Sequence, residues 1–300
     1  MKKISILITG AFLLSIIGAA TVKAQSLNLI EKREVYDKEH IPKKDPVPYP
    51  YIRESDVMYE KTVWRMLNLR EKMNQPLYYP TTPIGDRKNL TQVLLDILKD
   101  PLPGHQVFAY APLMQYEFEQ PMSTEDIFKQ IGADTIREPV FDSTIMDFTL
   151  QVTKVEMPLD EVNRIMIKEK WFFDRRYSTM QVRIIGICPI KVALREIEDP
   201  VTGLTIQTGE VSKLPLFWVY YPEVRYYLAK QEVFNPMNDA QRISFDDLLN
   251  QRRFSSWIYR ISNVQDNRNV SDYAHGMDAM FEAERLKYEL FEFEHDLWEY

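Results

Sequence analysis

Apolar residues in the last 24 positions of the chain, 277–300, recur at alternating spacings of four and three. This spacing predicts an amphipathic helix in which one seam of side chains packs against the chain's own domain. A second row, formed by Phe281, Tyr288, Phe291 and Trp298, widens the apolar side, and the remaining positions are mostly acidic. A second aromatic row is harder to bury within one domain, so the pattern favours a protein–protein contact, with burial inside the domain as the alternative.

Helical spacing and capping residues predict further helices along the chain. Ser123 and Ser244 occupy the positions of helix caps, and proline or glycine ends several of the periodic segments. The segments predicted to be helical are residues 55–74, 90–98, 123–132, 158–166, 222–230 and the segment that follows Ser244.

Strands are predicted where apolar and polar residues alternate. The candidates are residues 107–111, 146–153, 171–173, 179–194, 204–208 and 214–221, with a hairpin turn at residues 199–203. Together these elements predict an α+β fold with a mainly antiparallel sheet flanked by helices. They leave open whether residues 56–300 form one domain or two, with a boundary near residues 134–143.

The first 24 residues have the pattern of a cleaved secretory signal peptide. Two lysines precede an apolar run over residues 4–20, and small residues stand at positions 22 and 24. An uncleaved anchor is the alternative, and the glycines and alanines within and at the end of the run disfavour it. Lipidation would need a cysteine after the cleavage site, whereas the single cysteine is Cys188. We therefore expect an exported, soluble protein that reaches a membrane only through another protein.

Residues 25–55 are predicted to form an extended, Pro-rich arm, because four prolines fall between positions 42 and 50. The arm is either a linker or a segment that lies across a neighbouring molecule. The folded core is then expected at residues 56–300, ending in the helix over residues 277–300.

The charge of the chain argues against nucleic acid as a partner. Removal of the signal peptide takes three lysines and leaves 34 basic and 44 acidic residues, a net charge of −10. Nucleic acids and anionic lipids favour clustered Lys and Arg instead. We expect no direct membrane insertion.

The sequence offers little for catalysis. None of the four histidines has zinc-site spacing, and no phosphate-binding or nucleophile motif is present. Glu292 could share a helix face with His295 or with Asp296 and bind a metal loosely, although a solvated face explains these residues as well. Asp246 and Asp247 fit the first turn of a helix, where acids stabilise the helix dipole. We expect no enzyme, no metal and no cofactor, and the apolar surroundings of Cys188 predict burial.

Residues 252–259 offer candidate partner contacts. Arg252, Arg253, Trp257 and Tyr259 follow the helix that Ser244 caps. Arginine and large aromatic residues dominate the binding energy of protein interfaces. Ordinary packing with solvent-facing arginines is the alternative.

Several separate segments, in this order, carry a family resemblance. They are Trp64-Arg65, residues 69–74, Pro76 to Pro80, Trp171 to Asp174, residues 182–187, Phe245 to Leu248, Arg252 to Ser256, Ser262-Asn263 and Phe293 to Tyr300. Together they resemble the GldN/PorN family of the type IX secretion and gliding machinery of Bacteroidetes.

The resemblance implies a non-enzymatic periplasmic subunit that supports protein export and gliding motility. Such subunits form a large ring with an outer-membrane lipoprotein of PorK/GldK type, which would supply the membrane tether. Self-neighbours in the ring and the periplasmic part of a PorM/GldM-type motor protein are further implied partners. Two alternatives remain, namely an adaptor that binds one partner without a ring, and an exported enzyme or metal-binding protein that uses the terminal Glu/His/Asp cluster.

Overall fold

The computed structural model describes residues 40–85, 87–113, 117–131, 135–142, 147–154, 159–198, 205–238 and 240–297. The chain divides into two compact units, Met1–Pro42 and Lys43–Tyr300. The first unit is described only at residues 40–42, which belong to a turn. The predicted signal peptide and residues 25–39 of the predicted arm lie outside the described residues, as do the hairpin turn at 199–203 and Trp298.

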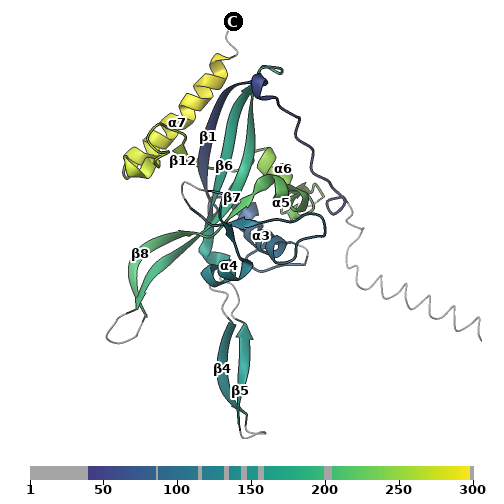
Figure 1. Ribbon diagram of the computed structural model, residues 1–300, viewed down its shortest axis with the longest axis vertical. Coiled ribbons are helices and arrows are strands. Elements are labelled where there is room, and N and C mark those ends of the chain that lie inside the picture. The colour runs from purple at the N-terminus through teal and green to yellow at the C-terminus, as the bar shows by residue number, and fades with distance from the viewer. Residues whose placement is uncertain are drawn as a thin grey trace, which may run out of the picture. The chain divides into compact units, whose positions relative to one another are not determined.

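An antiparallel sheet of eight strands is the main element of the second unit (Figure 1). Its strand order is β12-β1-β6-β7-β9-β2-β3, and β8 pairs with β7 off this path. The long strands are β1 (Val57–Asn68), β6 (Val162–Asp174), β7 (Thr179–Glu198) and β8 (Thr205–Pro215). The short strands are β2 (Ala109–Tyr110), β3 (Pro121–Met122), β9 (Trp218–Tyr220) and β12 (Trp257–Ile261).

Two further strand pairs hydrogen-bond apart from this sheet. They are β4 (Thr135–Asp142) with β5 (Asp147–Lys154), and β10 (Glu232–Val233) with β11 (Ile243–Ser244). The predicted α+β class with a mainly antiparallel sheet is confirmed.

Most predicted helices are present. They are α3 (Leu90–Lys99), α4 (Thr124–Ile131), α5 (Tyr221–Leu228), α6 (Phe245–Asn250) and α7 (Met277–Asp296), with a short α2 (Gln75–Tyr78) between β1 and α3. Three 3₁₀ turns complete the described elements: η1 (Glu54–Asp56), η2 (Leu159–Glu161) and η3 (Val270–Asp272). No helix within the described ranges is long and apolar enough to cross a bilayer.

Two helix predictions were wrong. Residues 55–74 form mainly β1, and residues 158–166 form η2 followed by the start of β6. In β1 every residue from Val63 to Leu67 is buried, because the strand lies between β12 and β6 and is covered on both faces. The apolar residues Val63, Trp64, Met66 and Leu67 therefore show no period-2 alternation, and their spacing also fits a helix. In β6 the register shifts between Val162 and Arg164, which breaks the alternation where the strand begins.

The main hydrophobic core lies where α3, α5 and α6 pack against the sheet. It includes fully buried side chains from each, such as Leu94, Tyr221 and Phe245, and Ile167 of β6. The start of α3 is fixed by Asn89, whose side-chain oxygen accepts the backbone N–H of Gln92 at 2.7 Å.

The described part of the predicted arm lies along its own folded unit. The Arg183 Nη2 donates to the Pro50 carbonyl at 2.7 Å, and the Arg176 Nη2 donates to the Tyr51 carbonyl at 2.7 Å. The ring of Tyr49 lies 4.0 Å from the guanidinium carbon of Arg225 on α5. These contacts attach the segment to β7, α5 and the turn that follows β6.

Candidate interaction site

The helix α7 uses one of its two apolar rows to pack against the sheet (Figure 1). Leu286 and Leu290 are buried in a small core with Val63 of β1 and Ile258 of β12. Farther along the helix, Phe293 stacks on Tyr59 of β1 with a ring-centre distance of 4.2 Å. The predicted inner seam is therefore part of the fold.

The second row remains exposed to solvent. Phe281, Tyr288 and Phe291 have exposed fractions of 60%, 62% and 59%. Their spacings of seven and three place them on one side of the helix, away from the buried seam. We call these three residues the outer row. Large aromatic side chains exposed together are typical of interaction surfaces.

Acidic side chains flank the outer row. Arg285 forms ion pairs with Glu282 at 2.7 Å and with Glu289 at 3.3 Å, so it neutralises part of the negative charge of these side chains. The hydrogen bond from Arg285 lowers the pKa of the Glu282 carboxyl below its ordinary value. The flank keeps a negative charge overall, because Asp278, Glu284 and Glu292 add to it.

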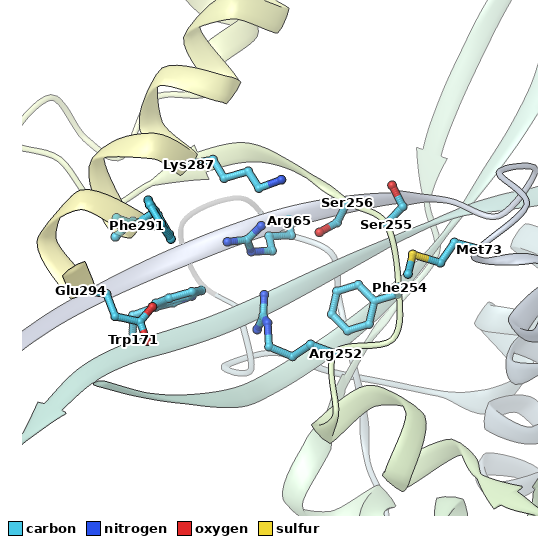
Figure 2. A pocket seen from close by; sticks show the side chains of 11 residues that line it. Arg65, Met73, Trp171, Arg252, Phe254, Ser255, Ser256, Lys287, Phe291 and Glu294 are labelled. Atoms are coloured by element: carbon cyan, nitrogen blue, oxygen red, sulfur yellow. The ribbon is translucent and has the colours of Figure 1, made fainter. Parts of the chain in front are cut away.

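A cleft of about 410 Å³ lies between α7, the long strands β1 and β6, and the loop after α6 (Figure 2). Its lining residues are Arg65, Met73, Trp171, Arg252, Phe254, Ser255, Ser256, Lys287, Leu290, Phe291 and Glu294. One end of the outer row, Phe291, therefore also lines the cleft.

The floor of the cleft is organised by Glu169, which is fully buried in β6. Its Oε2 accepts hydrogen bonds from the Arg65 Nε and the Trp171 Nε1, both at 3.0 Å. Its Oε1 accepts from the Arg252 Nη1 at 2.8 Å. Burial lowers the pKa of Arg65 from its ordinary value, and the nearby Glu169 opposes this shift. A buried carboxylate is tolerated here because two guanidinium groups compensate it.

The Trp171 ring contacts the guanidinium groups of both Arg65 and Arg252. Its ring centre lies 5.4 Å from the guanidinium carbon of Arg65 and 5.1 Å from that of Arg252, within the range of cation–π contacts. Figure 2 shows the two guanidinium groups turned toward one another beside this ring.

The backbone at the end of α6 places Arg252. Its φ is 54°, a left-handed conformation, and the N–H of Arg253 bonds to the Leu248 carbonyl at 3.1 Å. This is a helix end of the type that glycine usually terminates. The arginine side chain found there instead reaches back to Glu169.

Comparison with known families decides the assignment. The model of the family described as gliding motility associated protein GldN matches residues 52–299. The chain belongs to the GldN family. A search of curated proteins found no match. The family resemblance is thus confirmed, and every residue of the outer row and of the cleft lies within the matched range of this GldN protein.

The structure brings together only some of the residues predicted for partner contact in this GldN protein. Arg252 and Phe291 meet at the cleft. Phe281 and Tyr288 lie on the outer row, whereas Arg253 is exposed at the end of α6 without a cleft contact. Trp257 and Tyr259 are half-buried on β12, and the guanidinium carbon of Arg164 lies 5.8 Å from the Trp257 ring.

Sequence reasoning missed Arg65, Glu169 and Trp171 as a site. A charged residue within an apolar strand segment is the available signal, and Arg65 inside Val63–Leu67 carries it. The wrong helix prediction for residues 55–74 concealed this signal.

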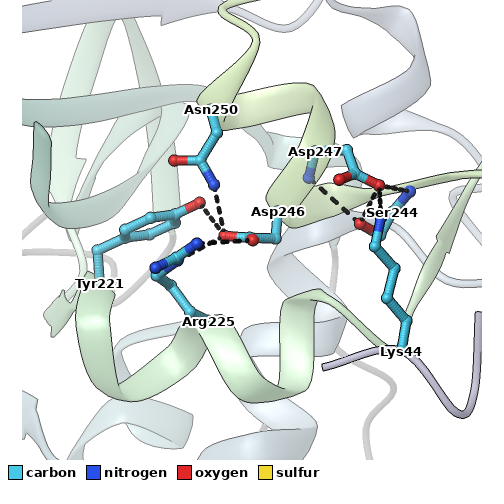
Figure 3. A network of polar contacts seen from close by, with 7 residues as sticks. All are labelled: Lys44, Tyr221, Arg225, Ser244, Asp246, Asp247 and Asn250. Atoms are coloured by element: carbon cyan, nitrogen blue, oxygen red, sulfur yellow. Dashed lines mark hydrogen bonds and ion pairs between the residues drawn. The ribbon is translucent and has the colours of Figure 1, made fainter. Parts of the chain in front are cut away.

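The acidic pair of α6 has a structural role in this GldN protein (Figure 3). Asp246 is buried and binds Arg225 through both oxygens, at 2.9 and 3.1 Å, while Tyr221 and Asn250 each donate to it at 2.8 Å. Asp247 forms a capping box with Ser244 and an ion pair with Lys44 of the arm.

The pKa of Asp247 reflects these contacts. Burial would raise the pKa of its carboxyl, but the hydrogen bonds from Lys44 and Ser244 outweigh this effect and lower it. Both acids of the pair are therefore engaged in contacts within the fold.

The remaining candidates for chemistry gain no support. Within the described ranges, no group of three or more His, Cys, Asp or Glu side chains is placed to hold a metal ion. Cys188 is buried as predicted, and burial raises the pKa of its thiol, which disfavours the reactive thiolate.

Proposed function

We propose that this GldN-family chain is a non-enzymatic structural subunit of the type IX secretion system that supports protein export and gliding motility. In this proposal it assembles with an outer-membrane lipoprotein of PorK/GldK type into a large periplasmic ring. The lipoprotein holds it at the outer membrane, and the periplasmic part of a PorM/GldM-type motor protein is a further partner. Membership of a family associated with gliding motility supports the proposal.

The observation that carries the proposal is the division of α7 into two apolar rows. The inner seam is buried against β1 and β12, whereas Phe281, Tyr288 and Phe291 are each about 60% exposed. Exposed aromatic side chains on a well-packed helix suit a permanent protein contact, because they add contact area with little loss of side-chain entropy.

A closed ring needs at least two different surfaces on each subunit. The outer row of α7 is the first. For the second we propose the region around β12, where Arg253, Trp257 and Tyr259 lie at an edge of the sheet. A protein with the outer row alone would fit the alternative function, an adaptor that binds one partner without a ring.

The test is co-purification of the tagged chain from its native envelope, followed by mass spectrometry and electron microscopy. The decisive variant carries Phe281→Ser, Tyr288→Ser and Phe291→Ser, and its control carries Met237→Ser and Val264→Ser. These two control residues are exposed at 91% and 103% and lie outside α7.

We expect the wild type and the control to recover the lipoprotein in ring-shaped particles, and the outer-row variant to remain folded but unassembled. An intact ring with the outer-row variant would contradict the assignment. A small complex with a single partner would favour the adaptor, and a monomer without partners would contradict both functions.

A further inference from the structure

The two arginines of the cleft use only part of their hydrogen-bonding capacity. Within the described residues, Arg65 donates through Nε alone and Arg252 through Nη1 alone. A guanidinium has five N–H donors, so four remain on Arg65. Arg65 is only 5% exposed, yet it lines the cleft. Its unused Nη atoms keep contact with solvent, so they are accessible from the cleft and can donate to an acceptor that enters it.

The charges around the cleft suit a ligand with one negative charge. Arg65, Arg252 and Lys287 are basic, while Glu294 lines the cleft and Glu169 lies beneath it. Three positive and two negative groups leave one positive charge, which one carboxylate balances. Two guanidinium forks also match the planar geometry of a carboxylate.

The walls of the cleft add an apolar requirement. Trp171, Phe254, Leu290 and Phe291 line it together with the aliphatic part of Met73. Its volume of about 410 Å³ falls within the range of roughly 300–1,000 Å³ usual for small-ligand pockets. An aromatic or large aliphatic group next to the carboxylate would fill the space between these walls.

We propose that this cleft is a receptor site for a carboxylate carried beside an aromatic residue in a segment of a partner protein. The carboxylate binds the unused N–H groups of Arg65 and Arg252, and the aromatic ring lies against Trp171 and Phe291. The carboxylate is either the end of a chain or an acidic side chain. Only the assignment of the ligand to a partner protein rests on the proposed function, whereas the binding chemistry does not.

The site is tested with the purified mature chain by isothermal titration calorimetry. The probes are N-acetylphenylalanine, acetyl-glutamyl-phenylalaninamide, the uncharged N-acetylphenylalaninamide and inorganic phosphate. We expect at least one of the two carboxylates to bind about tenfold or more tightly than the uncharged amide, since a charge-assisted hydrogen bond contributes a factor of this order. The first probe represents a chain end and the second an acidic side chain. The probe that binds more tightly therefore identifies the source of the carboxylate.

Variants of α7 examine the site without disturbing Glu169. Lys287→Gln removes a positive charge from the cleft, so we expect it to weaken carboxylate binding about threefold. Glu294→Gln removes a negative charge from the cleft, so we expect it to tighten carboxylate binding about threefold. Arg285→Gln is the control, because it makes the same charge change as Lys287→Gln outside the cleft. It should leave the affinity within about twofold of the wild type.

Three results would overturn the inference. They are equal affinity for the carboxylate probes and the amide, tighter binding of phosphate than of the carboxylate probes, and a failure of Lys287→Gln and Glu294→Gln to change the affinity in opposite directions. This outcome is distinguishable from failure of the proposed function. If calorimetry shows no carboxylate binding but the ring is recovered by co-purification, only the cleft proposal is rejected. If the carboxylate binds but no partner is recovered, only the proposed ring assembly is rejected.

Discussion

The αL conformation of Arg252 leads to a quantitative prediction about stability. An L side chain at positive φ costs about 1–2 kcal/mol relative to the right-handed region, and glycine avoids this cost. At Arg252, with φ of 54°, the hydrogen bond of 2.8 Å to buried Glu169 offsets the strain. Replacement by alanine and by glycine therefore separates the two contributions.

Both replacements remove the bond to Glu169, but only glycine relieves the strain. Losing a hydrogen bond to a charged group costs about 1.5–3 kcal/mol, and we expect about 2 because Arg65 and Trp171 still bond to Glu169. Glycine recovers the strain of about 1–2 kcal/mol and loses about 0.5–1 through the greater freedom of the unfolded chain. Arg252→Gly should thus be more stable than Arg252→Ala by roughly 0.5–1 kcal/mol.

The assay is urea unfolding followed by tryptophan fluorescence, with the midpoint and slope fitted for each variant. Arg253→Ala and Arg253→Gly form the matched control, because Arg253 is the exposed neighbour and does not have a positive φ. There the order should reverse, with glycine the less stable. If Arg252→Gly is no more stable than Arg252→Ala, the proposed backbone strain at Arg252 is refuted. If Arg252→Ala is as stable as the wild type, the proposed contribution of the hydrogen bond to Glu169 is refuted.

Three further predictions concern buried charge and burial. Glu169→Gln keeps the shape of the side chain but removes the charge that compensates Arg65. The free energy of unfolding should therefore fall by about 3 kcal/mol in the same urea assay, and an unchanged free energy would contradict this prediction. The pKa of Asp247 is lowered on folding, so its stabilisation is present above about pH 4 and is lost as the pH falls through the folded pKa. The difference in Tm between wild type and Asp247→Asn should therefore shrink from pH 6 to pH 3, and a constant difference would argue against the Lys44 contact. Burial raises the pKa of Cys188, so native protein at pH 8 should resist iodoacetamide and react only in urea, as mass spectrometry would show.

The helix α7 was predictable because it presents one face to solvent and buries the other. In α7 the buried Leu286 and Leu290 alternate with exposed acidic positions, and this contrast creates the period that sequence reasoning detects. The strand β1 has no such contrast over Val63–Leu67, since β12 and β6 flank it and both of its faces are covered. Burial on both sides removes the pattern that distinguishes a strand from a helix.

The cleft was only partly predictable for a related reason. Arg252 and Phe291 belong to residue types and positions that indicate an interface. The pairing of Arg65 with Glu169, which are 104 positions apart, depends on the register of β1 with β6. Nothing local in either segment fixes that register, so the floor of the site follows from the sheet and from no single stretch of sequence.

The two rows of α7 determine which experiment on this helix is informative. Deletion of residues 277–300 should abolish assembly, but it also uncovers Val63 and Ile258, which Leu286 and Leu290 bury. Loss of assembly would then follow from loss of the fold as readily as from loss of a contact. The outer row avoids this ambiguity, because its three aromatic side chains are mostly exposed and their replacement leaves the inner seam in place. A folded but unassembled outer-row variant, with unchanged Tm, is therefore the result that separates recognition from stability in this helix.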